Sequence, residues 1–262
     1  MDWQFSTRFR LGLPHPQLVQ AGSCPGCQAP LCSADAMHIL RCDTLSGSRT
    51  YVHDAVVREV AAVVRDSTLG SAIHTDARHC REYFPQRPPT ATSEHRVPDV
   101  VFVHHTGRER ECLDVTVRRP AVHHRSGAAA LAAQKVKLRH YLPWMRQRGG
   151  GTFTPLAIET YGTLAPDFQR FLRRAGRHHV QRLASVDSED PPEEPMTYLF
   201  TQRIVVQLMR AQAHEFRELL LAGGVRDSTL QEDQSDMTRL EVEADVEGAP
   251  TLEDTALVQL EG

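Results

Sequence analysis

Two runs of β-branched residues, each containing one aspartate, constrain the fold of this chain more than any other feature. They are VPDVVFVHH at 97–105, with Asp99, and RECLDVTV at 110–117, with Asp114. A short turn around Gly107 separates the two runs, so we expect them to pair as antiparallel strands. Because both runs are apolar on both faces, they suit the centre of a sheet better than a half-exposed hairpin.

The rest of the body alternates between helical and extended patterns. Helices are predicted from amphipathic periodicity or strong helix formers, and strands from short apolar runs between turn residues. The predicted helices cover 51–66, 126–144, 165–179 and 196–224, and two further strands are expected at 80–85 and 152–162. This order favours an α/β fold with a mixed central β-sheet flanked by helices.

Composition divides the chain into six segments. The first fifty residues are rich in Cys, Pro and Gly, and a Pro- and acid-rich stretch interrupts the later helical pattern. The expected segments are a linker at 1–20, a cysteine module at 21–50, the α/β domain at 51–184, a second linker at 185–195, an amphipathic helix at 196–225 and an acidic, disordered tail at 226–262.

Charge is distributed unevenly along the chain. Residues 231–262 contain ten acids and one Arg, a net charge of −9, which leaves +6 on residues 1–230 because the whole chain carries −3. A basic body with an acidic tail suits a polyanionic partner. A soluble domain with a disordered end explains the same charge pattern without any partner.

Neither a membrane span nor a signal peptide is recognisable. No apolar run approaches the roughly 18–20 residues that a transmembrane helix needs, and the N-terminal residues lack the apolar core of a signal peptide. We therefore expect an intracellular, nuclear protein that does not associate with membranes. Thiols stay reduced in that compartment, so the six cysteines are better interpreted as metal ligands or core thiols than as disulfides.

The two aspartates are expected to lie opposite each other. If the strands turn about the midpoint between Thr106 and Gly107, paired residues have numbers that sum to 213, as those of Asp99 and Asp114 do. Their side chains would project from one face and repel each other unless a proton or a cation lies between them. We predict that they bind Mg²⁺ or Mn²⁺. The alternative is structural: the acids cap a turn or pair with nearby arginines.

Lysine is rare in this chain and occurs at one place. Of 30 basic side chains only Lys135 and Lys137 are lysines, and both lie in one predicted helix. They are about 200° apart around that helix, so only one of them should face the acids. Two carboxylates, a divalent cation and an ammonium group suit phosphodiester hydrolysis. The pattern of the helix leaves both lysines as candidates.

The cysteine module contains a set of metal-ligand type. Cys24 and Cys27 are separated by two residues, and His38 and Cys42 by three, with ten residues between the pairs. Four such ligands suit a structural Zn²⁺ ion, and His38 and Cys42 would lie one helical turn apart. Buried thiols are the alternative, and Cys32 could replace one of the ligands.

Several of these motifs together resemble a known nuclease family. RVPD at 96–99, LDVTV at 113–117 and Lys on the following helix resemble the PD-(D/E)XK, or restriction-endonuclease-like, superfamily. The RFRLGLPHP, CPGCQ…HILRC and VHDAVVREV segments are similar, in order, to the linker, the CCHC zinc knuckle and the first helix at the C-terminal end of site-specific non-LTR retrotransposon reverse-transcriptase proteins. The likeness covers about residues 8–172.

The resemblance implies a role for individual residues. Asp99 and Asp114 match the metal-binding acids of the family, and KLRHY matches its Lys-x3-Tyr, which favours Lys137 over Lys135 as the catalytic lysine. Two further positions correspond to accessory residues, an acid on the first helix and a basic residue before Pro-Asp. They are Glu59 and Arg96.

The function implied is that of a Mg²⁺-dependent DNA endonuclease that hydrolyses phosphodiester bonds. DNA is the expected partner, and RNA or a retrotransposon ribonucleoprotein is a further one. A second interpretation is a catalytically inactive nucleic-acid-binding module that retains the nuclease fold and the zinc knuckle. A third is a protein-interaction unit that acts through the 196–222 helix and the acidic tail.

Overall fold

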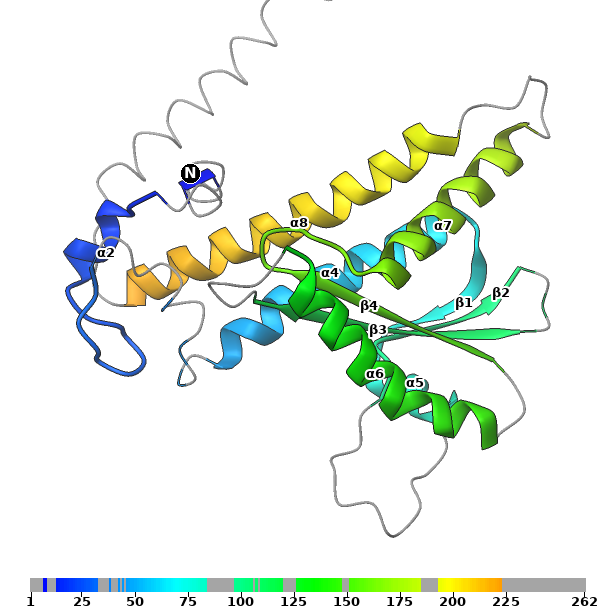
Figure 1. Ribbon diagram of the computed structural model, residues 1–262, viewed down its shortest axis with the longest axis horizontal. Coiled ribbons are helices and arrows are strands. Elements are labelled where there is room, and N and C mark those ends of the chain that lie inside the picture. Colours follow the sequence, from blue (N-terminus) through cyan, green and yellow to red (C-terminus); the bar gives the residue numbers. More distant parts are fainter. Residues whose placement is uncertain are drawn as a thin grey trace, which may run out of the picture.

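A four-stranded mixed sheet between two layers of helices forms the body of the molecule (Figure 1). The computed structural model describes residues 7–8, 13–32, 38, 42, 44, 46–83, 97–105, 107, 109–119, 126–147, 151–184 and 193–222. The expected α/β class, with helices flanking a mixed sheet, is therefore confirmed.

The strands lie in the sheet in the order in which they occur in the chain. They are β1 (Gly70–His74), β2 (Val100–His104), β3 (Arg110–Arg118) and β4 (Thr152–Glu159). The pairs β1–β2 and β2–β3 are antiparallel, whereas β3–β4 is parallel. The two Asp-containing runs thus lead into or form the two central strands, as their apolar character on both faces predicts.

The register between β2 and β3 is the one that the turn midpoint predicts. Val100 pairs with Leu113 and Val103 with Arg110, so the numbers of paired residues sum to 213. The turn itself contains Gly107 at φ +71°, a conformation that a residue with a Cβ rarely adopts, and its N–H donates to the His104 carbonyl.

A helical crossover places β4 beside β3. The connection contains α6 (Ala128–Gln147), a length that a parallel connection between neighbouring strands requires. Pro155 lies inside β4 opposite Asp114. The proline is tolerated because β4 is an edge strand, so its missing N–H removes no hydrogen bond to a further strand.

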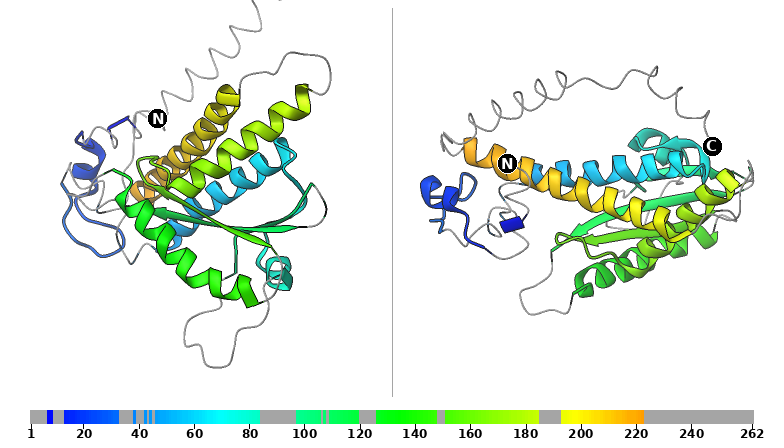
Figure 2. Two further views of the ribbon diagram at one scale, coloured as in Figure 1. Left: turned by 45° about the vertical axis from the view of Figure 1, so that its right-hand side comes forward. Right: turned by 90° about the horizontal axis from the view of Figure 1, so that it is seen from above.

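The helices cover the sheet unequally. α4 (Ser46–Asp66), α7 (Pro166–Ala184) and α8 (Glu193–Ala222) pack on one face, while α6 and the short α5 (Ala77–Tyr83) lie on the other (Figures 1 and 2). The sheet residues in the larger core are Val100, Phe102, Leu113, Val115, Leu156 and Ile158. Those on the α6 side are Val101, Cys112 and Phe153.

The first strand was expected at 80–85, and this prediction is wrong. Residues Cys80–Tyr83 belong to α5, and the first strand is β1 at Gly70–His74. Asp76 explains the helix, because its carboxylate accepts a hydrogen bond from the His79 N–H at 2.9 Å and so caps the helix N-terminus. The sequence of β1, GSAIH, has weak strand propensity and depends on its pairing with β2.

Several expected segment boundaries also move. The helix expected to begin at 51 begins at Ser46, inside the proposed cysteine module, and α8 begins at Glu193, inside the proposed second linker. The proposed linker at 1–20 contains most of a further helix, α2 (Pro16–Ala21). The acidic tail lies outside the described residues.

The N-terminal part contacts the far end of α8. Leu18 of α2 is buried against Ala213, Phe216 and Leu220. The buried His15 ring lies 5.2 Å from the Phe216 ring, and burial, aided by the charge of Arg8, lowers the pKa of His15 to about 4. The imidazole is therefore neutral and acts as part of this apolar contact.

None of the helices in the described part of the chain is both long enough and apolar enough to cross a membrane.

Gly70 is expected to be intolerant of substitution, because β1 approaches β2 closely there. A Cβ at this position would lie 2.6 Å from the Val103 carbonyl oxygen and would overlap the buried Phe102 ring. Gly70→Ala should lower the free energy of unfolding by about 1–3 kcal/mol, measured by urea denaturation. The control Ser71→Ala, at the next and exposed position, should change it by less than about 0.5 kcal/mol. Equal effects of the two substitutions would contradict this packing argument.

Candidate functional site

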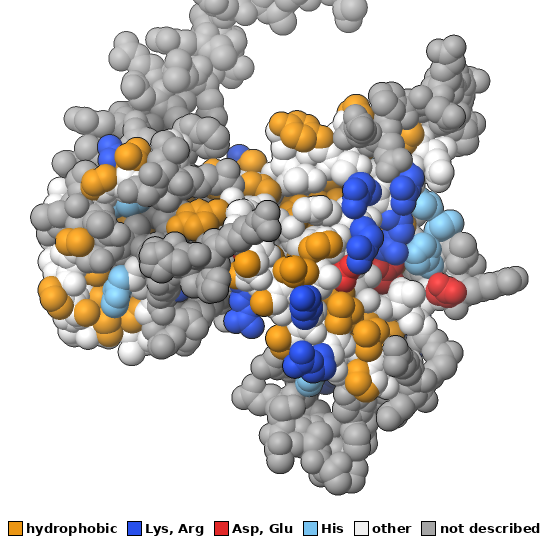
Figure 3. Space-filling model, in the orientation of Figure 1, with side chains coloured by type: hydrophobic (Ala, Val, Ile, Leu, Met, Phe, Trp, Pro, Cys, Tyr) orange, Lys and Arg blue, Asp and Glu red, His pale blue; other side chains and the backbone are white. Residues whose placement is uncertain are grey.

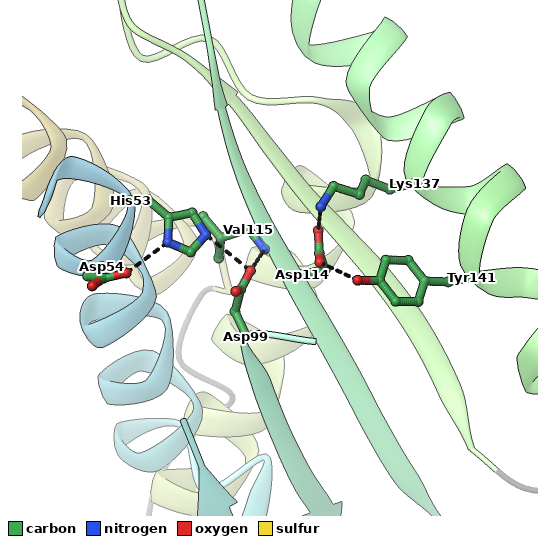
Figure 4. Close-up of polar contacts among 7 residues, drawn as sticks. All are labelled: His53, Asp54, Asp99, Asp114, Val115, Lys137 and Tyr141. Atoms are coloured by element: carbon green, nitrogen blue, oxygen red, sulfur yellow. Dashed lines mark hydrogen bonds and ion pairs between the residues drawn. The ribbon is translucent and has the colours of Figure 1, made fainter. Parts of the chain in front are cut away.

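Asp114 is a buried carboxylate in the middle of the central strand β3, with 2% of its surface exposed. Both of its oxygens are contacted from α6 (Figure 4): the Tyr141 hydroxyl donates to Oδ1 at 3.0 Å, and Lys137 Nζ lies 2.5 Å from Oδ2. Lys137 and Tyr141 are four residues apart, so they lie on the same side of the helix. The Lys-x3-Tyr spacing therefore places an ammonium and a hydroxyl on one acid.

The structure distinguishes the two lysines. The Lys137 side chain is only 14% exposed and forms the ion pair, whereas Lys135 is exposed on the opposite side of α6. The face of α6 that contains Lys137 also contains Ala130, Ala133 and Tyr141, all of which are buried. Packing of this apolar face on the sheet is what directs Lys137 toward Asp114.

The electrostatic state of Asp114 depends on opposing effects. Burial, followed by the negative charge of Asp99, raises the pKa of Asp114, while the Lys137 charge and the hydrogen bonds from Lys137 and Tyr141 lower it. A carboxylate in such a place is stabilised only if a positive charge stays next to it. Among the described residues, Oδ2 has no hydrogen-bond partner of good geometry beyond this ion pair.

Asp99 lies directly before β2 and is held by different groups. Its Oδ2 accepts a hydrogen bond from the Val115 N–H at 2.7 Å and lies 3.2 Å from His53 Nε2 on α4. The Asp99 N–H donates to the Leu113 carbonyl. In the register of the β2–β3 pair, where paired numbers sum to 213, the residue opposite Asp99 would be Asp114 and not Leu113. The strand pairing thus becomes irregular at Asp99, where Pro98 precedes the strand.

The two acids are electrostatic neighbours but do not point the same way. In Figure 4 the Asp99 carboxylate points toward His53 of α4, whereas Asp114 points toward Lys137 and Tyr141 of α6. The expectation that both side chains project from one face therefore needs correction. The shift of pairing at Asp99 is the reason, because a displacement of one residue turns a strand side chain away from its former face.

His53 was not identified in the sequence as a site residue. It is part of the amphipathic VHDAVVREV segment, and its only local signal is the adjacent acid Asp54, whose Oδ1 lies 2.9 Å from His53 Nδ1. Burial lowers the pKa of His53, but the carboxylates of Asp99 and Asp54 outweigh it and raise the pKa to about 9. The imidazole is therefore positively charged near neutral pH and supplies a cation to Asp99.

Of the two accessory residues implied by the resemblance, Glu59 is described by the structure and contacts other groups. Glu59 lies six residues beyond His53 on α4 and accepts a hydrogen bond from Arg203 Nε of α8 at 2.7 Å. Arg203 also contacts Asp66 at 2.7 Å, so Glu59 takes part in an ion-pair network between the two helices. Arg96 lies outside the described residues.

The four ligands proposed in the cysteine module come together. The ligand atoms of Cys24, Cys27, His38 and Cys42 all lie within 4.8 Å of one another and could hold a metal ion such as Zn²⁺. Cys27 Sγ lies 3.2 Å from His38 Nε2. Three thiols and one imidazole form a ligand set typical of structural zinc. Cys32 is exposed and is not a member of the cluster.

Local backbone turns account for this cluster. The Gln28 N–H donates to the Cys24 carbonyl at 2.9 Å, which closes a turn around the first ligand pair. The Cys42 N–H donates to the His38 carbonyl at 2.8 Å, so the second pair is one helical turn apart, as predicted. The Thr44 hydroxyl, 2.8 Å from Cys42 Sγ, lowers the pKa of that thiol to about 6 and favours the thiolate form that metals bind.

A second, more exposed group of potential ligands was not foreseen. His74 at the end of β1, together with Asp76 and His79 at the start of α5, also has ligand atoms within 4.8 Å of one another. The Asp76 carboxylate already caps α5 and lies 2.7 Å from His79 Nδ1, so the helix N-terminus explains its geometry.

The charge of His53 should make stability depend on pH. The folded-state pKa is raised from 6.5 to about 9, so the stabilisation is complete below pH 6.5 and disappears as the pH rises through 9. His53→Gln should cost about 1–2 kcal/mol of unfolding free energy at neutral pH and little at pH 10. Urea denaturation at both pH values, without divalent cations, tests this. A cost independent of pH, or a His53 pKa near 6.5 by NMR, would contradict it.

The cysteine cluster should bind one zinc ion per chain. Cys27→Ser removes a ligand and should reduce the zinc content, measured by elemental analysis of purified protein, because three remaining ligands bind more weakly than four. Cys32→Ser is a matched control, since it alters a nearby exposed thiol outside the cluster. Loss of zinc from the Cys32 variant instead of the Cys27 variant would show that the ligand assignment is wrong.

Comparison with known proteins identifies no relative of this chain. No protein-family model matches it, and neither the curated proteins nor the solved structures contain a significant match.

Proposed function

We propose that this protein is a metal-dependent DNA endonuclease related to the PD-(D/E)XK domain of site-specific non-LTR retrotransposon proteins. The observation that carries the proposal is the 2.5 Å contact between Lys137 Nζ and Asp114 in the central strand, with Asp99 nearby. An acid and a lysine from separated positions of the chain are thus in contact, and the charge of a second acid acts on them from nearby. Hydrolysis of a phosphodiester requires such groups, because negative charge develops on the phosphate.

The arrangement of elements supports the same family. A helix, three antiparallel strands, a crossover helix and a parallel fourth strand give the mixed, helix-flanked sheet that the resemblance implies. Asp99 lies directly before the second strand, Asp114 in the third and Lys137 on the crossover helix. This order of acid, acid and lysine along the elements supports the proposed resemblance of RVPD, LDVTV and KLRHY to the family motifs.

A divalent cation, Mg²⁺ or Mn²⁺, would be held by Asp99 and Asp114. In the structure the two carboxylates do not converge on one ion, because Asp99 points toward α4 and Asp114 toward α6, so the proposal requires Asp99 to turn toward Asp114 when the metal binds. When bound, the metal polarises the phosphate and activates a water molecule. The oxygen ligands match the preference of both ions.

The chain's own groups have separate roles in this proposal. Lys137 places a positive charge where negative charge develops on the phosphate, and Tyr141 orients Asp114 through its hydroxyl. His53, charged at neutral pH, holds Asp99 in place together with the Val115 N–H. The cysteine cluster would hold a structural Zn²⁺ ion beside the nuclease domain. DNA is the proposed substrate, RNA or a ribonucleoprotein a further partner, and the nucleus the location.

A catalytically inactive nucleic-acid-binding module is the second candidate, and one observation favours it. Each acid already has internal partners: Asp99 has His53 and a backbone N–H, and Asp114 has Lys137 and Tyr141. In this alternative the acids stabilise the sheet and the chain binds nucleic acid without cutting it.

Nicking of supercoiled plasmid tests the proposal. Wild-type protein with Mg²⁺ should convert supercoiled DNA to the open circle, and Lys137→Gln should slow this by about 10²–10³-fold because one charge-stabilising group is lost. Lys135→Gln, which removes the same charge from the same helix, should retain wild-type activity. The rate of conversion is measured by gel electrophoresis.

Two controls separate chemistry from folding and from zinc loss. Asp114→Asn should abolish nicking, and Ca²⁺ in place of Mg²⁺ should suppress it without the zinc removal that a chelator causes. Circular dichroism of each variant checks the fold. DNA binding by folded, zinc-loaded wild type without any nicking would favour the inactive module, and equal activity of the two lysine variants would contradict the role of Lys137.

A further inference from the structure

A row of four arginines follows one face of α7. Arg170, Arg173, Arg174 and Arg177 are spaced at i, i+3, i+4 and i+7, which places them along one side of the helix. All four line a cavity of about 590 Å³, together with Phe153 and Thr154 of β4 and with Asp167 and Phe171 of α7. In Figure 3 basic side chains gather over this part of the molecule, with acidic side chains beside them.

Two of these arginines pair with buried acids. Arg174 forms an ion pair with Glu111, whose side chain is fully buried and also accepts a hydrogen bond from the Thr154 hydroxyl at 2.7 Å. Arg170 pairs with the buried Asp167 one turn earlier on α7. The pair with Glu111 positions the Arg174 guanidinium group at the wall of the cavity, whereas Arg170 stays largely exposed.

The wall of the cavity carries more positive than negative charge. Arg173 and Arg177 are exposed, and among the described residues that line the cavity Asp167 is the one acid. Arg174 Nε is a buried donor without a hydrogen-bond partner among the described residues. Counting Glu111, four positive charges meet two negative ones, so the cavity has an excess of two positive charges and donors suited to oxyanions.

We propose that this α7 cavity, lined by Arg170, Arg173, Arg174 and Arg177, binds consecutive phosphate groups of a nucleic-acid strand. Seven residues of helix extend about 10 Å, so the arginines form a row and do not converge on one point. A strand presents a series of phosphates along such a row, whereas a single phosphate would neutralise only part of it. Arginine is also the side chain best suited to bidentate phosphate contacts.

The cavity adjoins the proposed chemistry but does not contain it, because Phe153, which lines the cavity, stacks on Tyr141 with ring centroids 4.4 Å apart. Thr154 pairs with Leu113 in the sheet, next to the pairing of Pro155 with Asp114. The cavity nevertheless opens beside α7, while Lys137 and Tyr141 approach Asp114 from α6 on the other face. The inference rests on the proposed function only for the choice of nucleic acid as the ligand.

Salt-dependent strand binding by the full chain tests this inference. Fluorescence anisotropy of a labelled oligonucleotide, single-stranded and duplex, is measured without Mg²⁺ over a series of NaCl concentrations. The cavity variant is R173Q/R177Q, which spares the two arginines that neutralise buried acids. The control is R58Q/R182Q, which removes two exposed or helix-end arginines of α4 and α7 that do not line the cavity. Circular dichroism verifies that both variants fold.

The expected result is a loss of phosphate contacts in the cavity variant alone. Its slope of log affinity against log salt should be shallower by about 1 per arginine, and its affinity about 10-fold lower, because each contact releases counterions from the strand. The control variant should retain the wild-type slope. Equal slopes for the two variants, or no binding by the wild type, would overturn the inference.

Two further comparisons identify what has failed. If inorganic phosphate displaces the oligonucleotide at an equal concentration of phosphate groups, the cavity takes a single phosphate and the inference is wrong. If the cavity variant binds the oligonucleotide like the wild type and still nicks plasmid, this inference is wrong and the proposed endonuclease function stands. If the cavity variant has a shallower slope of log affinity against log salt and the wild type does not nick plasmid, this inference is supported and the proposed endonuclease function is contradicted.

Discussion

The buried contact between Lys137 and Asp114 is the interaction on which the centre of this structure depends. A carboxylate in a central strand is costly to desolvate, and the nearby Asp99 adds repulsion. Lys137 and Tyr141 offset that cost from one turn of α6, so the crossover helix must pack on β3 in one orientation. The same contact that stabilises the core also places an ammonium group beside Asp114, and under the proposed function this group would stabilise charge on a phosphodiester.

The remaining charged groups lie in the opposite layer of the fold, on α4, α7 and α8. His53 compensates Asp99 from α4, Arg203 joins Glu59 and Asp66 between α4 and α8, and the arginine row lies on α7. Each ion pair connects elements that are far apart in the chain. Under the proposed function, α6 supplies the chemistry and α7 holds the strand, while the cysteine cluster is a separate unit at the N-terminal side.

The two central strands and β4 could be predicted from the local pattern of apolar residues, whereas the edge strand β1 could not. The two apolar runs and the turn at Gly107 were sufficient for the β2–β3 register, because side-chain alternation and turn length leave few ways to pair them. β1 was missed because GSAIH gains its strand conformation from pairing with β2, and α5 was mistaken for a strand because its cap at Asp76 was not recognised. His53 was missed because a histidine on a helix gives no sign of a partner 46 residues away.

The sequence by itself determined the fold class, the pairing of the Asp-containing strands and the presence of a cysteine cluster, while the structure left Cys32 outside that cluster. These depend on residue spacing within single turns or adjacent strands, where backbone geometry leaves little freedom. Only the tertiary structure decided between Lys135 and Lys137, turned Asp99 toward α4, joined Glu59 to Arg203 and assembled the α7 cavity. Those outcomes depend on which helix face packs on which side of the sheet. That packing is decided by burial of apolar surface over the whole domain and not by the local sequence around each residue.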